Sequence, residues 1–204
     1  MQSVITVSFG QFKSLSLFSL SVGGHDDNVF SIHGAAFARL YKYIKQITGV
    51  ELSDVDIEKL KQGFKIKTFR RLQYLLQEGD VCRYMCFITS GALRMYSINE
   101  KRQEAIVSFG LEENWMSDQE SLLLQTSSLY NIEAVEETTV LMISLNQFRE
   151  LAAGINAFDK MVRVYDHQQA IATQKRIPAV ISLSAEARYQ DMLVSHPQYS
   201  QRFS

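Results

Sequence analysis

Cysteine, proline and tryptophan are scarce in this sequence of 204 residues, with two, two and one copies respectively. No apolar run reaches the roughly 18 residues needed to span a bilayer. We therefore expect a soluble, cytoplasmic protein with no membrane partner. The net charge of -1 gives no field that would by itself attract nucleic acid.

The two cysteines, Cys82 and Cys86, do not form an obvious disulfide or metal site. On one strand they would point the same way about 13 Å apart, at roughly 3.3 Å per residue, which is too far for a disulfide. No further ligand residues accompany them, so the pattern does not favour zinc. We expect two buried, inert thiols.

Positive charge is absent from a long internal stretch. No Lys, Arg or His occurs from Gln103 to Gln147, whereas eight carboxylates do. A buried phosphate without a charged partner is costly, and the carboxylates would add repulsion. An anionic ligand is therefore disfavoured in this part of the chain.

Catalytic patterns are also missing. The four histidines, His25, His33, His167 and His196, all lie outside residues 64–144. The sequence has no G-x-S-x-G elbow, phosphate-binding loop or Cys-His arrangement. We predict no catalytic residue, no metal ligand and no cofactor.

Apolar spacing predicts two helices ahead of a strand-rich region. The first covers residues 35–47, where apolar residues recur at helical intervals. The second begins after Ser53, an N-cap candidate followed by Asp54 and Asp56, and ends at Gly63. Between Phe64 and Ser144 the pattern changes to seven or eight short strands separated by turn signals. Together these patterns predict an α+β fold built on a jelly-roll barrel.

Helical spacing returns at Leu145 and continues in a longer segment from Asn156 to about Arg176. Pro178 is expected to kink or end that helix, and a further amphipathic helix is expected over residues 185–194. Alternating steps of three and four residues predict a paired-helix seam. Its members are Met161, Val164, Gln168, Ile171 and Lys175.

The chain is therefore divided into three parts. Residues 1–33 form a leader, which is either disordered, an added edge strand, or the product of an over-called start codon. Residues 34–153 form the barrel domain with its entry helices. Residues 154–204 form the long helix and a linker toward any further domain.

The stretch L-L-Q-E-G-D-V-C-R-Y-M-C-F-I-T-S-G, residues 75–91, combines two turn glycines, an acidic turn and an apolar block. It resembles the first signature of the cyclic nucleotide-binding domain in Crp/Fnr-type bacterial transcription regulators. The matching positions are Gly79, Asp80, Cys82, Met85, Phe87, Ile88 and Gly91. Leu76 and Cys86 depart from the signature mildly.

The resemblance extends over most of residues 35–204 and implies an architecture. Such proteins have a double-stranded β-helix barrel, short entry helices and a long helix that pairs two subunits. It therefore implies a homodimer. DNA binding would come only from a winged helix-turn-helix beyond Ser204, and the effector, a small molecule or a protein, is not identified by the sequence.

The segment N-W-M-S-D-Q-E-S-L-L-L-Q-T-S-S-L-Y, residues 114–130, corresponds to the family's phosphate-binding cassette. Ser117 and Asp118 stand where the family has a Gly-Glu pair that receives the ribose. Ser128, Leu129 and Tyr130 stand where it has an Arg-Ser/Thr-Ala run that grips the phosphate. The ligand-binding positions implied by the resemblance are Ser117, Asp118, Gln119, Ser127, Ser128 and Leu129.

These replacements remove the positive charge, so an ordinary cyclic nucleotide is not expected to bind. The hydroxyls and carboxylates either hold a neutral or cationic ligand or form a helix cap and a solvated loop. We favour the helix cap, because an N-cap followed by acidic residues is a routine helix start.

The sequence thus predicts a sensor and dimerisation module of a Crp/Fnr-like transcription regulator, without enzymatic activity. Two alternatives remain open at this point. One is a stand-alone binding module that acts through protein partners. The other, which the missing barrel histidines disfavour, is a cupin-like barrel enzyme.

Overall fold

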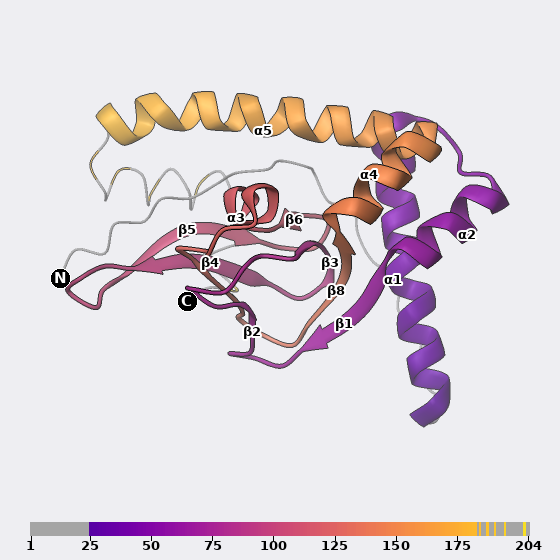
Figure 1. The fold of residues 1–204 in the computed structure, drawn as a ribbon, viewed down its shortest axis with the longest axis horizontal. Helices are drawn as coiled ribbons and strands as arrows, with labels where there is room; N and C mark the ends of the chain where they lie inside the picture. The colour runs from indigo at the N-terminus through magenta and orange to yellow at the C-terminus, as the bar shows by residue number, and fades with distance from the viewer. Residues whose placement is uncertain are drawn as a thin grey trace.

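The structure is a computed structural model that describes residues 25–182 and the single positions Ser184, Ala187, Gln190, Val194 and Arg202. Its strands form two four-stranded antiparallel sheets, in the orders β1-β8-β3-β6 and β2-β7-β4-β5 (Figure 1). The predicted jelly-roll barrel in an α+β fold is confirmed. Helices α1, α4 and α5 gather at one end of this barrel.

The strands are short, and β3, β7 and β8 are largely buried between the two packed sheets and the helices. Their bounds are β1 Lys65–Phe69, β2 Tyr74–Leu76, β3 Tyr84–Ser90, β4 Leu93–Ile98, β5 Glu104–Gly110, β6 Trp115–Met116, β7 Asn131–Ala134 and β8 Thr138–Ser144. Strand β8 pairs with both β1 and β3 in the first sheet, which leaves β1 at the edge. Strand β4 pairs with β5 and β7 in the second sheet.

Five helices accompany the barrel in the described residues: α1 His25–Thr48, α2 Asp54–Gly63, α3 Gln119–Leu124, α4 Leu145–Gly154 and α5 Asn156–Ser182. Ser53 caps α2 in a capping box with Asp56, as the sequence predicts. The predicted start of the first helix at residue 35 is wrong, because α1 begins at His25. The last residues assigned to the leader, 25–33, therefore belong to this helix.

Helix α5 differs from prediction at its end. It continues through Pro178 to Ser182, so of the two predicted outcomes the end of the helix at Pro178 is wrong, and a kink there stays a prediction. A proline removes one N–H from the helical ladder and crowds the preceding turn, yet the neighbouring residues keep helical geometry here. The helix predicted over residues 185–194 lies largely outside the described residues.

The core joins the barrel to its helical end. Phe87 and Val140 are fully buried on the central strands, and Leu40 and Phe158 are fully buried on α1 and α5. Aromatic rings fill the junction, where Trp115 lies between Phe87, Phe148 and Tyr165 with ring centroids 5.1, 6.0 and 6.4 Å away. The barrel and its helices therefore share one packed interior. No described helix has the length and apolar character to cross a membrane.

Candidate functional site

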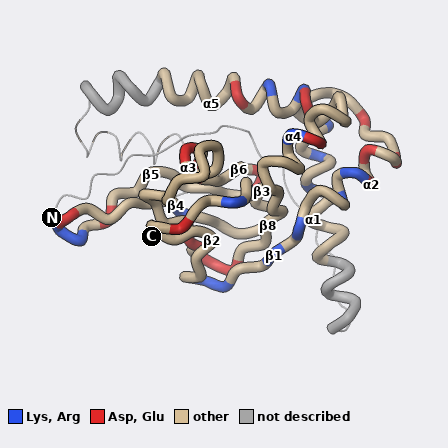
Figure 2. The backbone as a smooth tube through the Cα atoms, viewed as in Figure 1, with Lys and Arg blue, Asp and Glu red and all other residues tan. Residues whose placement is uncertain are grey.

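The cassette segment begins where β6 leaves the aromatic core. Trp115 and Met116 are buried on β6 and pair with Phe87 and Cys86 of β3. After Met116 the chain turns into helix α3, which begins at Gln119 and has Asp118 as its N-cap. The sequence alternative in which this segment is a helix cap is therefore confirmed for Asp118. Figure 2 shows α3 with acidic but no basic positions.

Asp118 is only 5% exposed, and both of its carboxylate oxygens are occupied. Oδ1 accepts a hydrogen bond of 3.2 Å from the backbone N–H of Ser121. Oδ2 accepts a hydrogen bond of 2.7 Å from the hydroxyl of Ser128. The two residues that replace the ribose-binding and phosphate-binding positions of the family are therefore bonded to each other.

Ser128 is 2% exposed and fixed on every side. Its hydroxyl also accepts the N–H of Tyr130 at 3.0 Å. Its backbone N–H donates to the carbonyl of Asp80, and its carbonyl accepts the N–H of Gly79, each at 2.8 Å. The turn at residues 78–80 is therefore hydrogen-bonded to the end of the cassette, so the signature segment and the cassette lie side by side.

Ser121 extends this network toward β3. Its hydroxyl accepts the N–H of Cys82 at 2.8 Å and donates to the carbonyl of Thr126 at 2.6 Å. The sequence gives no sign of this role, because a serine in a short polar helix has no distinctive pattern. Cassette polar groups that could have met a ligand are largely paired with one another.

Other predicted site residues do not join this network. Gln119, Ser127 and Leu129 are exposed, and Leu129 is 68% exposed. Ser117 is half-buried, and its hydroxyl oxygen is buried without a hydrogen-bond partner among the described residues. Ser117 is therefore the one predicted position with an unsatisfied polar group directed inside the protein.

Arg94, on a strand of the second sheet, is paired with carboxylates outside the cassette. Arg94 lies on β4 opposite Glu133 of β7, on the face turned away from the core residues Leu93 and Ala134. Its guanidinium bonds to the buried carboxylate of Glu133 at 2.7 Å and to Glu104 at 2.7 Å. Arg94 thus neutralises two of the eight carboxylates and does not serve a ligand.

Tyr96 completes this second polar cluster. Its hydroxyl donates to Glu133 at 3.2 Å, and the hydroxyl of Tyr74 lies 3.2 Å from it. Burial, the neighbouring Tyr74 and the Glu133 carboxylate raise the pKa of Tyr96. The cluster stabilises the second sheet from its outer face.

Both thiols are buried and free, as predicted. Burial raises the pKa of Cys82 even though backbone hydrogen bonds with Asp118 and Tyr84 act to lower it, and burial raises the pKa of Cys86 to about 12. A thiol reacts as its thiolate, so we expect both side chains to be unreactive in the folded chain. Within the described part of the chain, no group of His, Cys, Asp and Glu is placed to hold a metal ion.

Part of the predicted helix seam packs into the core of the same chain. Met161 is 1% exposed and belongs to the core, so it has no free surface for a second subunit, and its assignment to the seam is wrong. Val164 and Gln168 are half-buried, and Ile171 is 52% exposed. The side chain of Lys175 lies outside the described residues. Met161 was misassigned because its helical spacing fits an internal contact equally well.

Comparisons with known proteins agree with this geometry. Residues 66–154 match the family described as the cyclic nucleotide-binding domain. No match was found among curated proteins.

Solved structures share the fold at low sequence identity. A cyclic nucleotide-binding domain from Methylobacillus flagellatus aligns with a TM-score of 0.59 and 13% identity, over 72% of this chain and 85% of that one. The sensor domain of the transcriptional regulator DNR from Pseudomonas aeruginosa aligns with a TM-score of 0.55 and 14% identity, over 76% and 99%. The catabolite activator protein of Thermus thermophilus aligns with a TM-score of 0.53 and 14% identity, over 63% of this chain and 60% of that one. The chain thus spans three-fifths of that regulator's length. Residues 66–154 thus match the cyclic nucleotide-binding domain, and the chain shares the fold of solved transcriptional regulators.

Proposed function

We propose that this chain is the sensor and dimerisation module of a Crp/Fnr-like bacterial transcription regulator, acting in the cytoplasm by binding rather than by catalysis. The observation that carries the proposal is the packing of α5 against the strand that enters the cassette. Trp115 is the first residue of that strand, β6, and Tyr165 of α5 packs against its ring. A change in the cassette therefore has a direct contact through which to act on the long helix.

The mechanism follows from rigid packing. Trp115 lies two residues before Ser117, and its ring also meets Phe148 of α4 at 6.0 Å, edge to face. Packed aromatic rings do not deform continuously, so a shift of β6 obliges α4 and α5 to move with it. An effector with different affinity for two such arrangements would set how the helices pair.

The ligand site in this proposal does not take a cyclic nucleotide. The Asp118 carboxylate is bonded to Ser128, which provides a hydroxyl at the position where the family has a cation. Neutralising a buried phosphate here would require a charge that the cassette lacks. The unsatisfied hydroxyl of Ser117 favours a neutral or cationic effector instead.

Calorimetric titration tests this half of the proposal. Cyclic AMP and cyclic GMP are each titrated into the chain, with Asp118→Asn as a matched variant that keeps the cap but removes the charge. We expect no binding to the natural chain up to about 1 mM, which corresponds to about 4 kcal/mol. Micromolar binding by the natural chain would contradict the proposed loss of nucleotide recognition.

Dimerisation would use the exposed half of α5. Val164, Gln168 and Ile171 follow seam spacing after Met161 turns into the core. Light scattering is expected to give a dimer that dissociates when Val164 and Ile171 are both replaced by Asp, because two buried carboxylates would face each other. Thr173→Asp, on the opposite side of the helix from Ile171, is the control and should stay dimeric.

Light scattering can contradict the proposed dimer in two ways. A natural chain that is monomeric at high concentration would contradict the dimer. A dimer that survives both Asp substitutions, with unchanged circular dichroism, would move the interface away from this face. DNA contact belongs to the proposal only for a longer chain that carries a C-terminal helix-turn-helix.

A further inference from the structure

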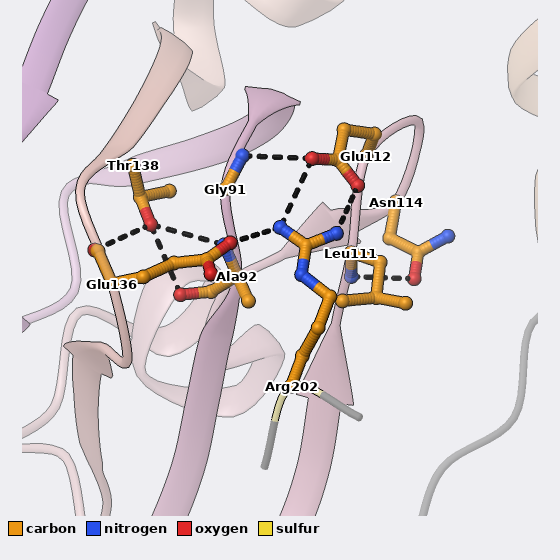
Figure 3. A network of polar contacts seen from close by, with 8 residues as sticks. All are labelled: Gly91, Ala92, Leu111, Glu112, Asn114, Glu136, Thr138 and Arg202. Atoms are coloured by element: carbon orange, nitrogen blue, oxygen red, sulfur yellow. Dashed lines mark hydrogen bonds and ion pairs between the residues drawn. The ribbon is translucent and has the colours of Figure 1, made fainter. Parts of the chain in front are cut away.

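Three turns meet at one end of the barrel and bring two carboxylates together. Gly91 lies between β3 and β4, Glu112 between β5 and β6, and Glu136 between β7 and β8. Figure 3 shows the two carboxylates with the guanidinium of Arg202 between them. Arg202 lies 90 positions after Glu112 in the sequence, so this contact joins a residue near the C-terminus to the barrel.

Glu112 is held in place independently of the arginine. Its Oε1 accepts the backbone N–H of Gly91 at 2.9 Å. Gly91 itself is fixed, because its φ is +94° and a Cβ there would lie 2.4 Å from the hydroxyl of Thr138. That hydroxyl also accepts the N–H of Ala92 at 3.0 Å. The Glu112 carboxylate is therefore held by the N–H of a rigid neighbouring turn.

The arginine fits this site as a fork. Nη1 donates to Oε2 of Glu112 at 2.7 Å, and Nη2 donates to Oε1 at 3.1 Å. Nη2 also contacts the carboxylate of Glu136. A planar guanidinium can make two parallel bonds to one carboxylate, whereas a lysine ammonium is a point charge. The side chains of Arg202 and Glu112 are only 27% and 26% exposed.

The electrostatics require a cation at this position. Glu112 and Glu136 both come from the stretch without Lys, Arg or His, and two close carboxylates repel each other when unpaired. Burial is the largest single influence on the pKa of Glu112 and raises it, but the hydrogen bonds and the charge of Arg202, together with backbone N–H groups, outweigh burial and lower that pKa. The hydrogen bonds that Arg202 donates to the two carboxylates raise the pKa of Arg202.

We propose that Glu112 and Glu136 form an arginine-binding site at the rim of the barrel, and that Arg202 occupies it as a latch for the segment after α5. Glu112 lies three residues before Trp115 on the path into the cassette. The latch therefore gives the barrel a second connection to the C-terminal segment, separate from the packing of α5. It does not depend on which effector the cassette binds, or on whether it binds one.

Paramagnetic NMR on the full chain tests the latch. A nitroxide is attached at Ser204→Cys, two residues beyond Arg202 and so within about 7 Å of chain length. Cys82 and Cys86 are buried and should not react with the label. We expect broadening of the amide signals of Gly91 and Glu136.

Arginine variants then decide the cause. Arg202→Gln should lower the equilibrium constant for the contact about tenfold, which corresponds to about 1.4 kcal/mol, and so reduce the broadening. Arg202→Lys should give an intermediate value. The double variant Glu112→Gln/Glu136→Gln should match Arg202→Gln. The control Glu113→Gln/Glu137→Gln changes the adjacent carboxylates and should keep the broadening.

Two results would overturn the latch. One is absence of broadening in the unsubstituted background, or equal broadening with Arg202→Gln. The other is broadening between spin-labelled chains and separate isotope-labelled chains when the two are mixed, because the arginine would then come from a second copy. The unchanged positions of the other amide signals would show that each variant keeps its fold.

Discussion

The hydroxyl of Ser128 lies 2.7 Å from Oδ2 of Asp118, ten positions away along the chain. This bond joins the two ends of the cassette, since Asp118 begins α3 and Ser128 precedes β7. In this chain the contact closes the loop upon itself. The same two positions in the resembling family hold the ribose and the phosphate.

The first prediction concerns the stability of this closed loop. Asp118→Ala removes the helix cap and leaves the N–H of Ser121 unpaired, so it should lower the free energy of unfolding by about 2 kcal/mol. Ser128→Ala should cost about 1 kcal/mol. Urea denaturation measures both, and the exposed Glu120→Ala is the control with little effect. Equal stability of Asp118→Ala and the natural chain would show that the network adds nothing.

Gly79 and Gly91 share a positive-φ backbone conformation but differ in the space around them. Gly79 and Gly91 have φ of +92° and +94°. A Cβ at Gly79 meets nothing within 4 Å, whereas at Gly91 it would lie 2.5 Å from the carbonyl oxygen of Glu137. Gly79→Ala should therefore cost about 1–2 kcal/mol for the left-handed backbone alone, and Gly91→Ala should cost distinctly more. Thermal and urea unfolding compare the two, and similar losses would contradict the steric argument.

Arg94 has one buried and one more exposed partner, which gives an internal comparison. The side chain of Glu133 is 4% exposed and that of Glu104 is 45% exposed. Arg94→Met would leave the buried Glu133 carboxylate without a cationic partner and with only the Tyr96 hydroxyl as a donor, so we expect a loss of about 3 kcal/mol. Glu104→Gln should cost less than about 1 kcal/mol. A small loss in both variants would show that the Glu133 carboxylate is already satisfied by Tyr96.

The thiols should be silent in the folded chain. Because burial raises the pKa of both, and that of Cys86 to about 12, neither should react with a chromogenic disulfide reagent at about pH 8. Both should react once urea unfolds the chain. Rapid reaction of one thiol under native conditions would show that the β3 region opens to solvent.

The latch should also appear in the pH dependence of stability. The pKa of Glu112 is lowered from its ordinary value of 4.5 when folded, so its ionised form stabilises the folded chain above that value. This stabilisation is lost as the pH falls through the lowered pKa. The groups that face Glu112 are Arg202, Glu136 and the N–H of Gly91. The stability difference between the natural chain and Arg202→Gln should be present at about pH 7 and shrink at about pH 3, and a constant difference would contradict the assignment.

Local signals in the sequence predicted the elements that local chemistry determines. Ser53 caps α2 because its hydroxyl reaches a free N–H in the first turn, and Asp118 caps α3 for the same reason. The strands follow from alternation and turn residues. The start of α1 was missed because its first turn is polar and carries no apolar spacing.

Contacts between distant segments were beyond the sequence. No pattern in the sequence links Arg94 to Glu133, whereas strand register places them opposite each other. The pairing of Arg202 with Glu112 and Glu136 joins positions that no short motif connects. Met161 shows the same limit, since helical spacing identifies a buried face without saying which partner buries it.

Strand β1 carries a consequence for how copies of this chain can meet. It forms one edge of its sheet, and Lys65 and Lys67 are exposed along it. Charged lysines on an edge strand oppose the addition of a strand from another molecule. The barrel is thereby protected from growing into a continuous sheet at that edge.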